Sequence, residues 1–413
     1  MAQWADYTTG ERIKLLRGRD IRQTDLAEMT GLSVVTIQKA EQDRALTLPT
    51  LLAIADALHV DTSVILGQQA PRRAMGRADR AVMRDLSRAV HDTAAGVLEG
   101  VTEEAPTLEE LEAVTARCWD LYWRGHYTEA GAVVAPFIGA AAALVHDRPV
   151  GAQAPALGVL SDAYRIAGYV ANLMGNRDLA YAAIGHAQAI AERASDDLRG
   201  ALVASGRAWV YLRDARLREA LSLAERAAVT IEPRFSTATT EQLTVYGSHI
   251  NFAAVVASRM GNKEQTADYL SQSHAAGARM GSEHKAHGTL FGPVTATTQA
   301  VGINVALGQA GKALSLASSI HDVSTLTPAA RNRYAMDKAM AQADAKMWDA
   351  SLDTLEGVLR ESPEWGRHQA LPGVIVQKVG KASTARLRRV SELIGVSATG
   401  IEGFAPATAK TAL

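Results

Sequence analysis

The segment from residue 23 to residue 41 carries the residue types that two short helices need where they cross. Ala27 is small at the position where the helices would touch, and Gly31 tolerates the positive φ that a tight turn between them requires. Ile37 and Ala40 give the second helix an apolar inner face. At these spacings the constraints together describe a helix-turn-helix, which holds its second helix so that the outer side chains can contact another molecule.

The outward side chains of that second helix are suited to reading a DNA groove. Val34 and Val35 form an apolar pair at its start, and valine methyl groups can contact the C5-methyl of thymine. Thr36 and Lys39 can reach a phosphate or a base edge, and Arg44, in the loop that follows, is a further phosphate candidate. The alternative for the valine pair is packing against another protein surface. The predicted DNA-binding residues are Gln23, Ser33, Val34, Val35, Thr36, Lys39 and Arg44.

Five short helices within residues 1–67 are expected to hold these side chains in place. Thr8 and Glu11 fit a capping box at the start of the first helix. Ser33 is a suitable N-cap for the third helix and Thr47 for the fourth. The second, third and fifth helices are expected near residues 23–30, 33–41 and 62–66.

Residues 10–66 resemble the Xre/Cro–CI family of DNA-binding domains. The matching motifs are Gly10-Glu11-Arg12-Ile13, Gln23-Thr24-Asp25-Leu26-Ala27, Gly31-Leu32-Ser33, Ile37 with Glu41, and the apolar series from Leu51 to Leu58. The resemblance implies double-stranded DNA as the partner, and Gln23 resembles the family's phosphate-contacting glutamine. It also implies a homodimer on a near-palindromic operator, with half-sites about one helical turn, ~34 Å, apart.

Charge is unevenly distributed along the chain. Residues 1–71 hold seven basic and nine acidic residues, a net charge of −2, whereas residues 72–88 hold six arginines and two aspartates, a net charge of +4. Residues 89–364 carry a net charge of −8. Residues 365–391 hold six basic residues and no acidic residue. Each basic run is either a solvated helix face or a phosphate-contacting segment, and we favour a capping helix for the second run. With a net charge of −2, the head has no large excess of positive charge to attract DNA.

A repeated pattern occupies residues 107–361. Short turns are followed by helix-length apolar patterns that open with a small residue, and one such pair of helices cannot bury its own apolar face. We therefore expect about six helix pairs stacked into an α-solenoid, in an all-α protein. The small residues that mark the repeats are Ala130, Ala180, Ala220, Ala267, Ala313 and Ala350.

This region resembles tetratricopeptide-type repeats, and the whole chain resembles a bacterial class of transcription regulators that join such repeats to an Xre-type head. The later landmarks of that class are the segments 289–293 and 363–368. The expected domains are the head over 1–67, a linker and connecting helix over 68–106, the repeats over 107–361, and a capping segment and tail over 362–413.

An effector is expected on the concave surface, which the first helix of each pair lines. Polar and aromatic residues on those helices are the candidates, although each of them can instead hydrogen-bond inside the solenoid or lie on plain surface. The charge of −8 favours a cationic or neutral ligand. The candidate effector-binding residues are Tyr164, Arg207, His249, Asn251, His287 and Thr295.

Several other functions are excluded or disfavoured by the sequence. One cysteine, Cys118, rules out an internal disulfide framework. No run of about 18 uninterrupted apolar residues and no charged, then apolar, leader is present, so a cytoplasmic location is expected. His284 and His287 would share one face of a helix, but no third ligand follows at a metal-site spacing. Gly311-Lys312 departs from a phosphate loop. We therefore expect no catalytic residues, no metal, no cofactor and no enzyme activity.

The sequence thus predicts a DNA-binding transcription regulator whose repeats mediate dimerisation and sense a peptide, small molecule or protein partner. The alternative is a tetratricopeptide-like interaction scaffold whose head no longer reads DNA.

Overall fold

The computed structural model describes most of the chain. The described residues are 7–18, 21–44, 46–58, 60, 62–66, 77–97, 106–379, 389–390 and 393. The chain divides into two compact units: Met1–Ala74 together with Ala339–Leu413 forms unit 1, and Met75–Lys338 forms unit 2. The two units are described separately.

The described residues of the head form five short helices, as the sequence predicts. Their apolar faces meet in one core that includes the fully buried Ile13, Leu26, Ile37 and Leu51. Side-chain caps begin three of the helices and fix where they start: Thr8, Ser33 and Thr47 accept from backbone N–H groups. The helices are α1 (Thr9–Arg17), α2 (Gln23–Thr30), α3 (Val34–Glu41), α4 (Leu48–Ala57) and α5 (Thr62–Ile65).

Three C-terminal helices also belong to unit 1: α18 (Trp348–Glu361), α19 (Pro363–Arg367) and α20 (Leu371–Val379). Gln377 Nε2 of α20 donates to Asp43 Oδ1, in the loop after α3, at 3.1 Å. The basic run over 365–391 therefore begins in folded helices, while Lys381, Arg386 and Arg388 lie outside the described residues.

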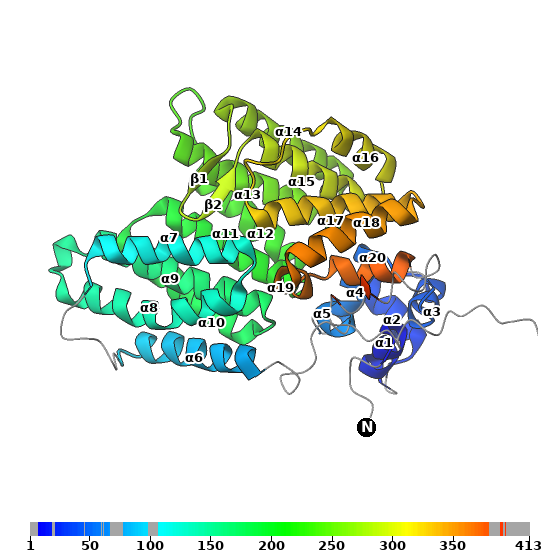
Figure 1. Ribbon diagram of the computed structural model, residues 1–413, viewed down its shortest axis with the longest axis horizontal. Helices are drawn as coiled ribbons and strands as arrows, with labels where there is room; N and C mark the ends of the chain where they lie inside the picture. The colour runs from blue at the N-terminus through cyan, green and yellow to red at the C-terminus, as the bar shows by residue number, and fades with distance from the viewer. Residues whose placement is uncertain are drawn as a thin grey trace, which may run out of the picture. The chain divides into compact units, whose positions relative to one another are not determined.

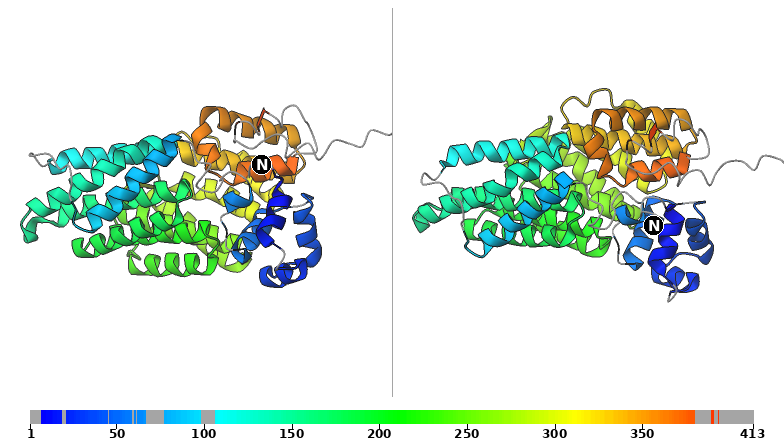
Figure 2. Two further views of the ribbon diagram at one scale, coloured as in Figure 1. Left: turned by 90° about the horizontal axis from the view of Figure 1, so that it is seen from below. Right: turned by 60° about the horizontal axis from the view of Figure 1, so that its bottom comes forward.

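Unit 2 is built from helices that follow one another in sequence and pack against their neighbours (Figure 1, Figure 2). Its elements are α6 (Arg77–Ala94), α7 (Leu108–Arg124), α8 (Tyr127–Asp147), a short 3₁₀ turn (Val150–Ala152), α9 (Ala154–Leu173), α10 (Arg177–Ala194), α11 (Asp197–Arg213), α12 (Leu217–Thr230), α13 (Thr240–Arg259), α14 (Lys263–Met280), β1 (His284–Ala286), β2 (Thr289–Phe291), α15 (Pro293–Ala306), α16 (Ala310–Ser319) and most of α17 (Pro328–Asp344). The body is thus repeat-like and helical.

Four of the six alanines that mark the repeats are buried, and at the other two markers the buried small residue is the neighbour of the alanine. Ala130, Ala180, Ala220 and Ala313 have no exposed surface. Ala267 is exposed and Ala350 is half-buried, and the buried neighbours are Thr266 and Ser351. Thr266 Oγ1 donates to the carbonyl oxygen of Asn262, the N-cap of its own helix, and Ser351 Oγ donates to that of Ala339, so a small polar residue is buried at these positions as well as alanine is. A pattern search for alanine alone misses this substitution.

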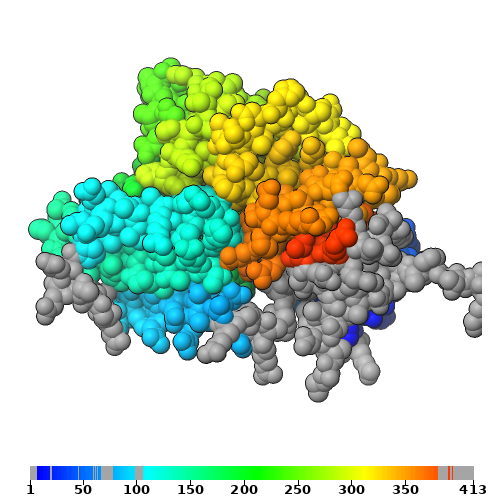
Figure 3. Space-filling model, viewed as in Figure 1, coloured from blue at the N-terminus to red at the C-terminus, as the bar shows by residue number. Residues whose placement is uncertain are grey.

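The arginine-rich α6 is an amphipathic helix that packs on α8, α9 and α10. Met83, Leu86 and Val90 are buried on its inner face, while Arg80 and Arg84 are exposed. Thr128 Oγ1 of α8 donates to Asp79 at 3.1 Å and ties the two helices together. In Figure 3 the blue surface of α6 borders the helices of the repeats, so the expected connecting helix is a layer of unit 2.

In the part of the chain that the structure describes, one helix, α8, is long and apolar enough to cross a membrane by length and composition. The expectation from uninterrupted apolar runs does not detect α8, because Glu129 and His146 bound its apolar run and leave it shorter than about 18 residues. In the structure α8 contacts α6, α7 and α9 and buries Val134, Phe137 and Ile138. It has the environment of a core helix.

Within the described residues, a two-stranded antiparallel hairpin is the exception to the helical architecture. β1 and β2 pair Ala286 with Thr289 and His284 with Phe291. His284 and His287 therefore lie on a strand and a turn, and the helical geometry considered for a His-x-x-His metal site is wrong. The described residues contain no group of three or more metal-ligating side chains.

Candidate nucleic-acid interface

The turn between α2 and α3 has the geometry that the sequence indicates. Gly31 adopts a left-handed conformation with φ of +67°, and Ala27 is 5% exposed at the helix contact. Ser33 caps α3 by accepting from Thr36 N at 3.1 Å, and its hydroxyl lies 2.8 Å from Thr36 Oγ1. The start of α3 is thereby ordered without help from a ligand.

A buried carboxylate fixes the end of α3 to the two preceding helices. Glu41 accepts from Arg17 Nε and from Gln23 Nε2, each at 2.7 Å, and its side chain is 1% exposed. The three helices α1, α2 and α3 are therefore joined at one point. Charge-assisted hydrogen bonds of this kind hold a geometry more strictly than apolar contacts do.

The outer face of α3 presents an ordered row of side chains to solvent. Val35 is 56% exposed, Lys39 is also exposed, and Val34 and Thr36 are half-buried. Gln38 is exposed on the same face, and we did not select it from the sequence. Its position four residues after Val34 was the available signal, because residues at i and i+4 share one face of a helix.

Two further predicted residues flank this face. Gln23 spends one amide hydrogen on Glu41, which leaves the second available to a phosphate. Arg44 is exposed in the loop after α3, where the preceding residue Asp43 has φ of +56° and accepts from Gly10 N at 2.7 Å. The loop that carries Arg44 is thus held to α1.

Much of the head's positive charge is used inside the fold. Arg12 is 1% exposed, and burial lowers the pKa of its guanidinium to about 10. Arg17 pairs with Glu41, and Arg22 pairs with Asp25 at 2.8 Å. The exposed cations that form no ion pair within the described part of the head are Lys14, Lys39 and Arg44. Few charges are therefore left for phosphate contacts.

The six candidate effector residues do not form one site. Tyr164 is 2% exposed beside the His186 ring, and burial raises the pKa of its phenol to about 12. His249 is fully buried, with its ring nitrogens 2.9 and 2.7 Å from the carbonyl oxygens of Val245 and Ala201. We accordingly drop both from the effector surface that we propose.

The other four candidates also have partners within the repeats. Asn251 Oδ1 accepts from Ser273 Oγ at 3.2 Å, and Arg207 Nε donates to Tyr211 at 3.3 Å. The carboxylate of Glu283 accepts from Val294 N and Thr295 N at the start of α15, and the Thr295 hydroxyl donates to the same carboxylate. His287 lies at the tip of the hairpin, with Nε2 2.6 Å from Glu241 Oε1. Of these four side chains, that of His287 contacts the residue that is farthest away in the sequence, Glu241 of α13.

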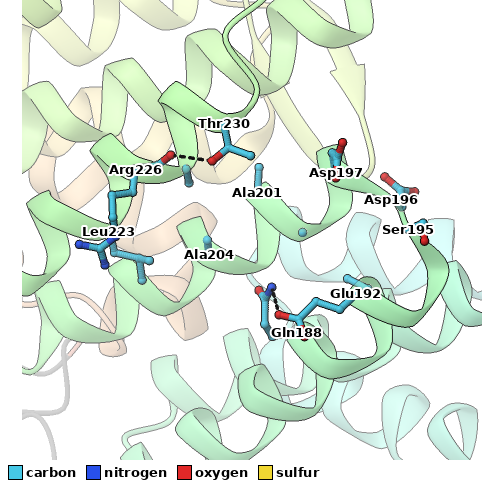
Figure 4. A pocket seen from close by; sticks show the side chains of 13 residues that line it. Gln188, Glu192, Ser195, Asp196, Asp197, Ala201, Ala204, Leu223, Arg226 and Thr230 are labelled. Atoms are coloured by element: carbon cyan, nitrogen blue, oxygen red, sulfur yellow. Dashed lines mark hydrogen bonds between the residues drawn. The ribbon is translucent and has the colours of Figure 1, made fainter.

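A surface pocket of about 590 Å³ lies between α10, α11 and α12 (Figure 4). Its floor is apolar, with Ala201, Ala204 and Leu223, and its rim carries three carboxylates and one guanidinium. None of the six candidates lines it. The lining residues are Gln188, Ala191, Glu192, Ser195, Asp196, Asp197, Gly200, Ala201, Ala204, Leu223, Arg226, Ala227 and Thr230.

Comparison with known proteins supports the assignment of the head. A family model described as helix-turn-helix matches residues 13–65, and unit 1 accordingly contains an Xre/Cro-like helix-turn-helix. Among curated protein sequences, none matches the chain. One similar solved structure is that of BtubC (BKLC) from P. vanneervenii, at 14% identity and a TM-score of 0.37, covering 62% of this chain and 91% of that one. A likeness of that size carries no argument about function.

Proposed function

We propose that this protein is a sequence-specific DNA-binding transcription regulator. The observation that carries the proposal is the outer face of α3, where Val35, Gln38 and Lys39 are exposed while Glu41 anchors the helix from behind. A helix held in this way can enter the major groove without rearranging. The match of residues 13–65 to a helix-turn-helix model supports the same function.

The contacts divide into positioning and reading. Lys39, Arg44 and the free amide hydrogen of Gln23 would contact phosphates, whereas Val34 and Val35 would contact thymine methyl groups. Gln38 would read adenine through its amide. With two or three charged phosphate contacts per head, the affinity of one head would be modest, and we propose that a homodimer on a near-palindromic operator supplies the rest.

The helical body would add dimerisation and effector sensing, and we propose that it is a tetratricopeptide-like solenoid in a cytoplasmic protein. An effector that binds one arrangement of the two heads better than another would shift the population of DNA-competent dimers. The alternative function, a scaffold whose head binds protein, is favoured by the exposed apolar side chains of Met29 and Val35.

Salt dependence separates these two functions. If the dimer releases about five counterions from DNA, the slope of log K against log salt is about −4 to −5, whereas apolar assembly has a slope near zero. Lys39→Ala removes one contact from each protomer of the dimer, so it should reduce the slope by about two and weaken binding to all sequences alike. Lys263→Ala, which removes an exposed lysine of α14, is the matched control and should leave binding unchanged.

The operators themselves can be found by genome-wide footprinting of the tagged full chain. Sharp, near-palindromic sites that disappear in the Val35→Ala, Lys39→Ala double variant would support the regulator. A flat salt slope together with unchanged footprints in the double variant would instead support the scaffold.

A further inference from the structure

The β1–β2 hairpin has an apolar base and a polar tip. Phe291 at its base is fully buried in a cluster with residues of α14 and α15. Ala286 pairs with Thr289, which leaves His287 and Gly288 as a two-residue turn with φ of +44° and +75°. This is the geometry of a tight hairpin turn whose two carbonyl groups project outward.

The tip lies against helices from three different pairs of the repeats. Arg165 of α9 donates to the carbonyl oxygen of His287, and Trp123 Nε1 of α7 donates to that of Gly288 at 2.7 Å. His287 Nε2 lies 2.6 Å from Glu241 Oε1 of α13. We call the receiving surface the tip cradle and define it as Trp119, Trp123, Arg165 and Glu241.

An aromatic floor completes the tip cradle. The Trp119 and Trp123 rings stack with centroids 6.3 Å apart, and the Arg165 guanidinium lies 4.6 Å from the Trp119 centroid. A Cβ added to Gly288 would lie 2.2 Å from Trp119 Cε2 and 2.5 Å from its Nε1. Glycine is therefore required at the tip by space as well as by φ, and the Trp119 indole N–H edge faces the occupant.

Two buried hydrogen-bond donors of the tip cradle have no partner. These are Trp119 Nε1 and Arg165 Nε, in side chains that are 5% and 1% exposed. A buried donor without an acceptor costs free energy, so such groups are rare in structures unless something else binds there. The hairpin tip fills the space of the cradle and leaves part of its hydrogen-bonding capacity unused.

The charges beside the tip cradle balance one another. Arg165 Nη2 lies 2.9 Å from Asp162, and Arg199 lies 3.1 Å from Asp162 and 2.6 Å from Asp196. Two guanidinium groups therefore face two carboxylates. The cradle is thus suited to neutral carbonyl oxygens, with Glu241 as the acceptor for an N–H group, and lacks the excess positive charge that an anion would select.

We propose that the tip cradle is a ligand-binding site which the hairpin tip occupies as an internal ligand. Its replacement would be a compact, uncharged or cationic molecule with two adjacent carbonyl oxygens, as in a peptide turn, and further acceptors for Trp119 Nε1 and Arg165 Nε. The site recognises two backbone carbonyl oxygens of the tip and the imidazole of His287, so a second molecule with the same groups can compete for it. The regulatory use of the site rests on the proposed function, but the binding itself does not.

The test supplies the tip in trans. The probe is a backbone-cyclised peptide that carries residues 285–290, titrated into the full-length protein without DNA while tryptophan fluorescence is followed. Gly288→Val should expel the tip, because valine is unfavourable at this φ and its Cβ meets Trp119. We expect this variant to bind the peptide at least tenfold more tightly than the native chain, in which the tethered tip competes.

Two further variants assign the binding to the tip cradle. Adding Trp123→Phe to Gly288→Val removes the donor to the second carbonyl and should weaken peptide binding at least fivefold. Trp348→Phe, on α18 of unit 1, is the matched control and should not weaken it. Equal binding by the native chain and Gly288→Val, or insensitivity to Trp123→Phe, would overturn the proposal.

Release of the hairpin has its own readout. Trypsin should cut after the exposed Lys285 at least tenfold faster in Gly288→Val, while cleavage after Lys263 on α14 stays unchanged. If Gly288→Val does not fold, His287→Asn replaces it, since asparagine tolerates positive φ and loses the contact with Glu241. If a folded variant releases the hairpin but its tip cradle does not bind the peptide, the proposal is refuted. The Lys39→Ala variant should bind the peptide normally. A failure of peptide binding can therefore be distinguished from a failure of DNA binding.

Discussion

Gln23 Nε2 donates to Glu41 Oε2 at 2.7 Å, so the first residue of α2 is joined to the last residue of α3. The same carboxylate receives Arg17 from α1. The orientation of the recognition helix thus depends on one buried carboxylate that lies behind its solvent-facing side chains. A change at Glu41 should therefore affect DNA binding without touching the surface that would meet DNA.

Glu41→Ala should destabilise the head by roughly 2–4 kcal/mol, because Arg17 and Gln23 lose their common acceptor in a mostly buried place. Hydrogen exchange of the α1–α3 amides measures this locally, without assuming that the two units unfold together. Glu28→Gln, which changes an exposed carboxylate of α2, is the control. Unchanged exchange in Glu41→Ala would show that the network is not needed for the fold.

Ser33→Ala should loosen the first turn of α3 by about 1 kcal/mol, because the cap to Thr36 N is lost. A loss of that size would weaken operator binding about fivefold, and Ser33→Asn should largely restore it. Thr107→Ala removes an equivalent cap from α7 and serves as the control. Titration of operator DNA against all three variants would show a defect confined to Ser33→Ala. An equal defect in Thr107→Ala would contradict a local role.

Gln38→Ala should lose discrimination at one base pair of the operator by about 1–3 kcal/mol, because a side-chain amide reads adenine in the major groove. Binding to operators with each substituted base pair measures this. Gln42→Ala, an exposed glutamine just beyond α3, should keep the native pattern. The prediction fails if Gln38→Ala weakens binding to every operator by the same factor.

Gly247→Ala should destabilise unit 2 by about 1–3 kcal/mol, because the added Cβ would lie 2.1 Å from Cε1 of the buried Phe291. Gly185→Ala on α10 meets nothing within 4 Å and should stabilise by about 0.5–1 kcal/mol, as alanine favours helix. Thermal unfolding of the two variants should shift in opposite directions. Equal shifts would mean that the hairpin base is not rigidly packed.

Stability should fall as the pH drops through 6.5. Burial lowers the pKa of His249 below its ordinary value of 6.5, and those of His186 and His274 move the same way. The unfolded chain then binds protons that the folded chain does not, so stability is lost from pH 6.5 down to the folded pKa. His249→Gln should flatten the dependence of Tm on pH, whereas His146→Gln, on exposed surface, should not. If the dependence of Tm on pH is unchanged in His249→Gln, the loss of stability at low pH is due to other titrating groups.

The five helices of the head were predictable because their determinants are local. Caps at Thr8 and Ser33, a glycine at position 31, and apolar residues at helical spacing each act within a few residues of where they stand. The side-chain contacts behind α3 were harder to predict from the sequence. Glu41 belongs to a sequence motif, but its role as an acceptor for α1 and α2 requires all three helices.

The repeats show where sequence by itself stops. It determined that this region is helical and repetitive, because the apolar spacing and small residues recur along the chain. Only the tertiary structure decided that Thr266 and Ser351, rather than Ala267 and Ala350, are the buried small residues, since any small side chain can fill such a position. It alone also brought Gly288 to Trp123 across 165 residues, a contact made by a backbone carbonyl that leaves no pattern in the sequence.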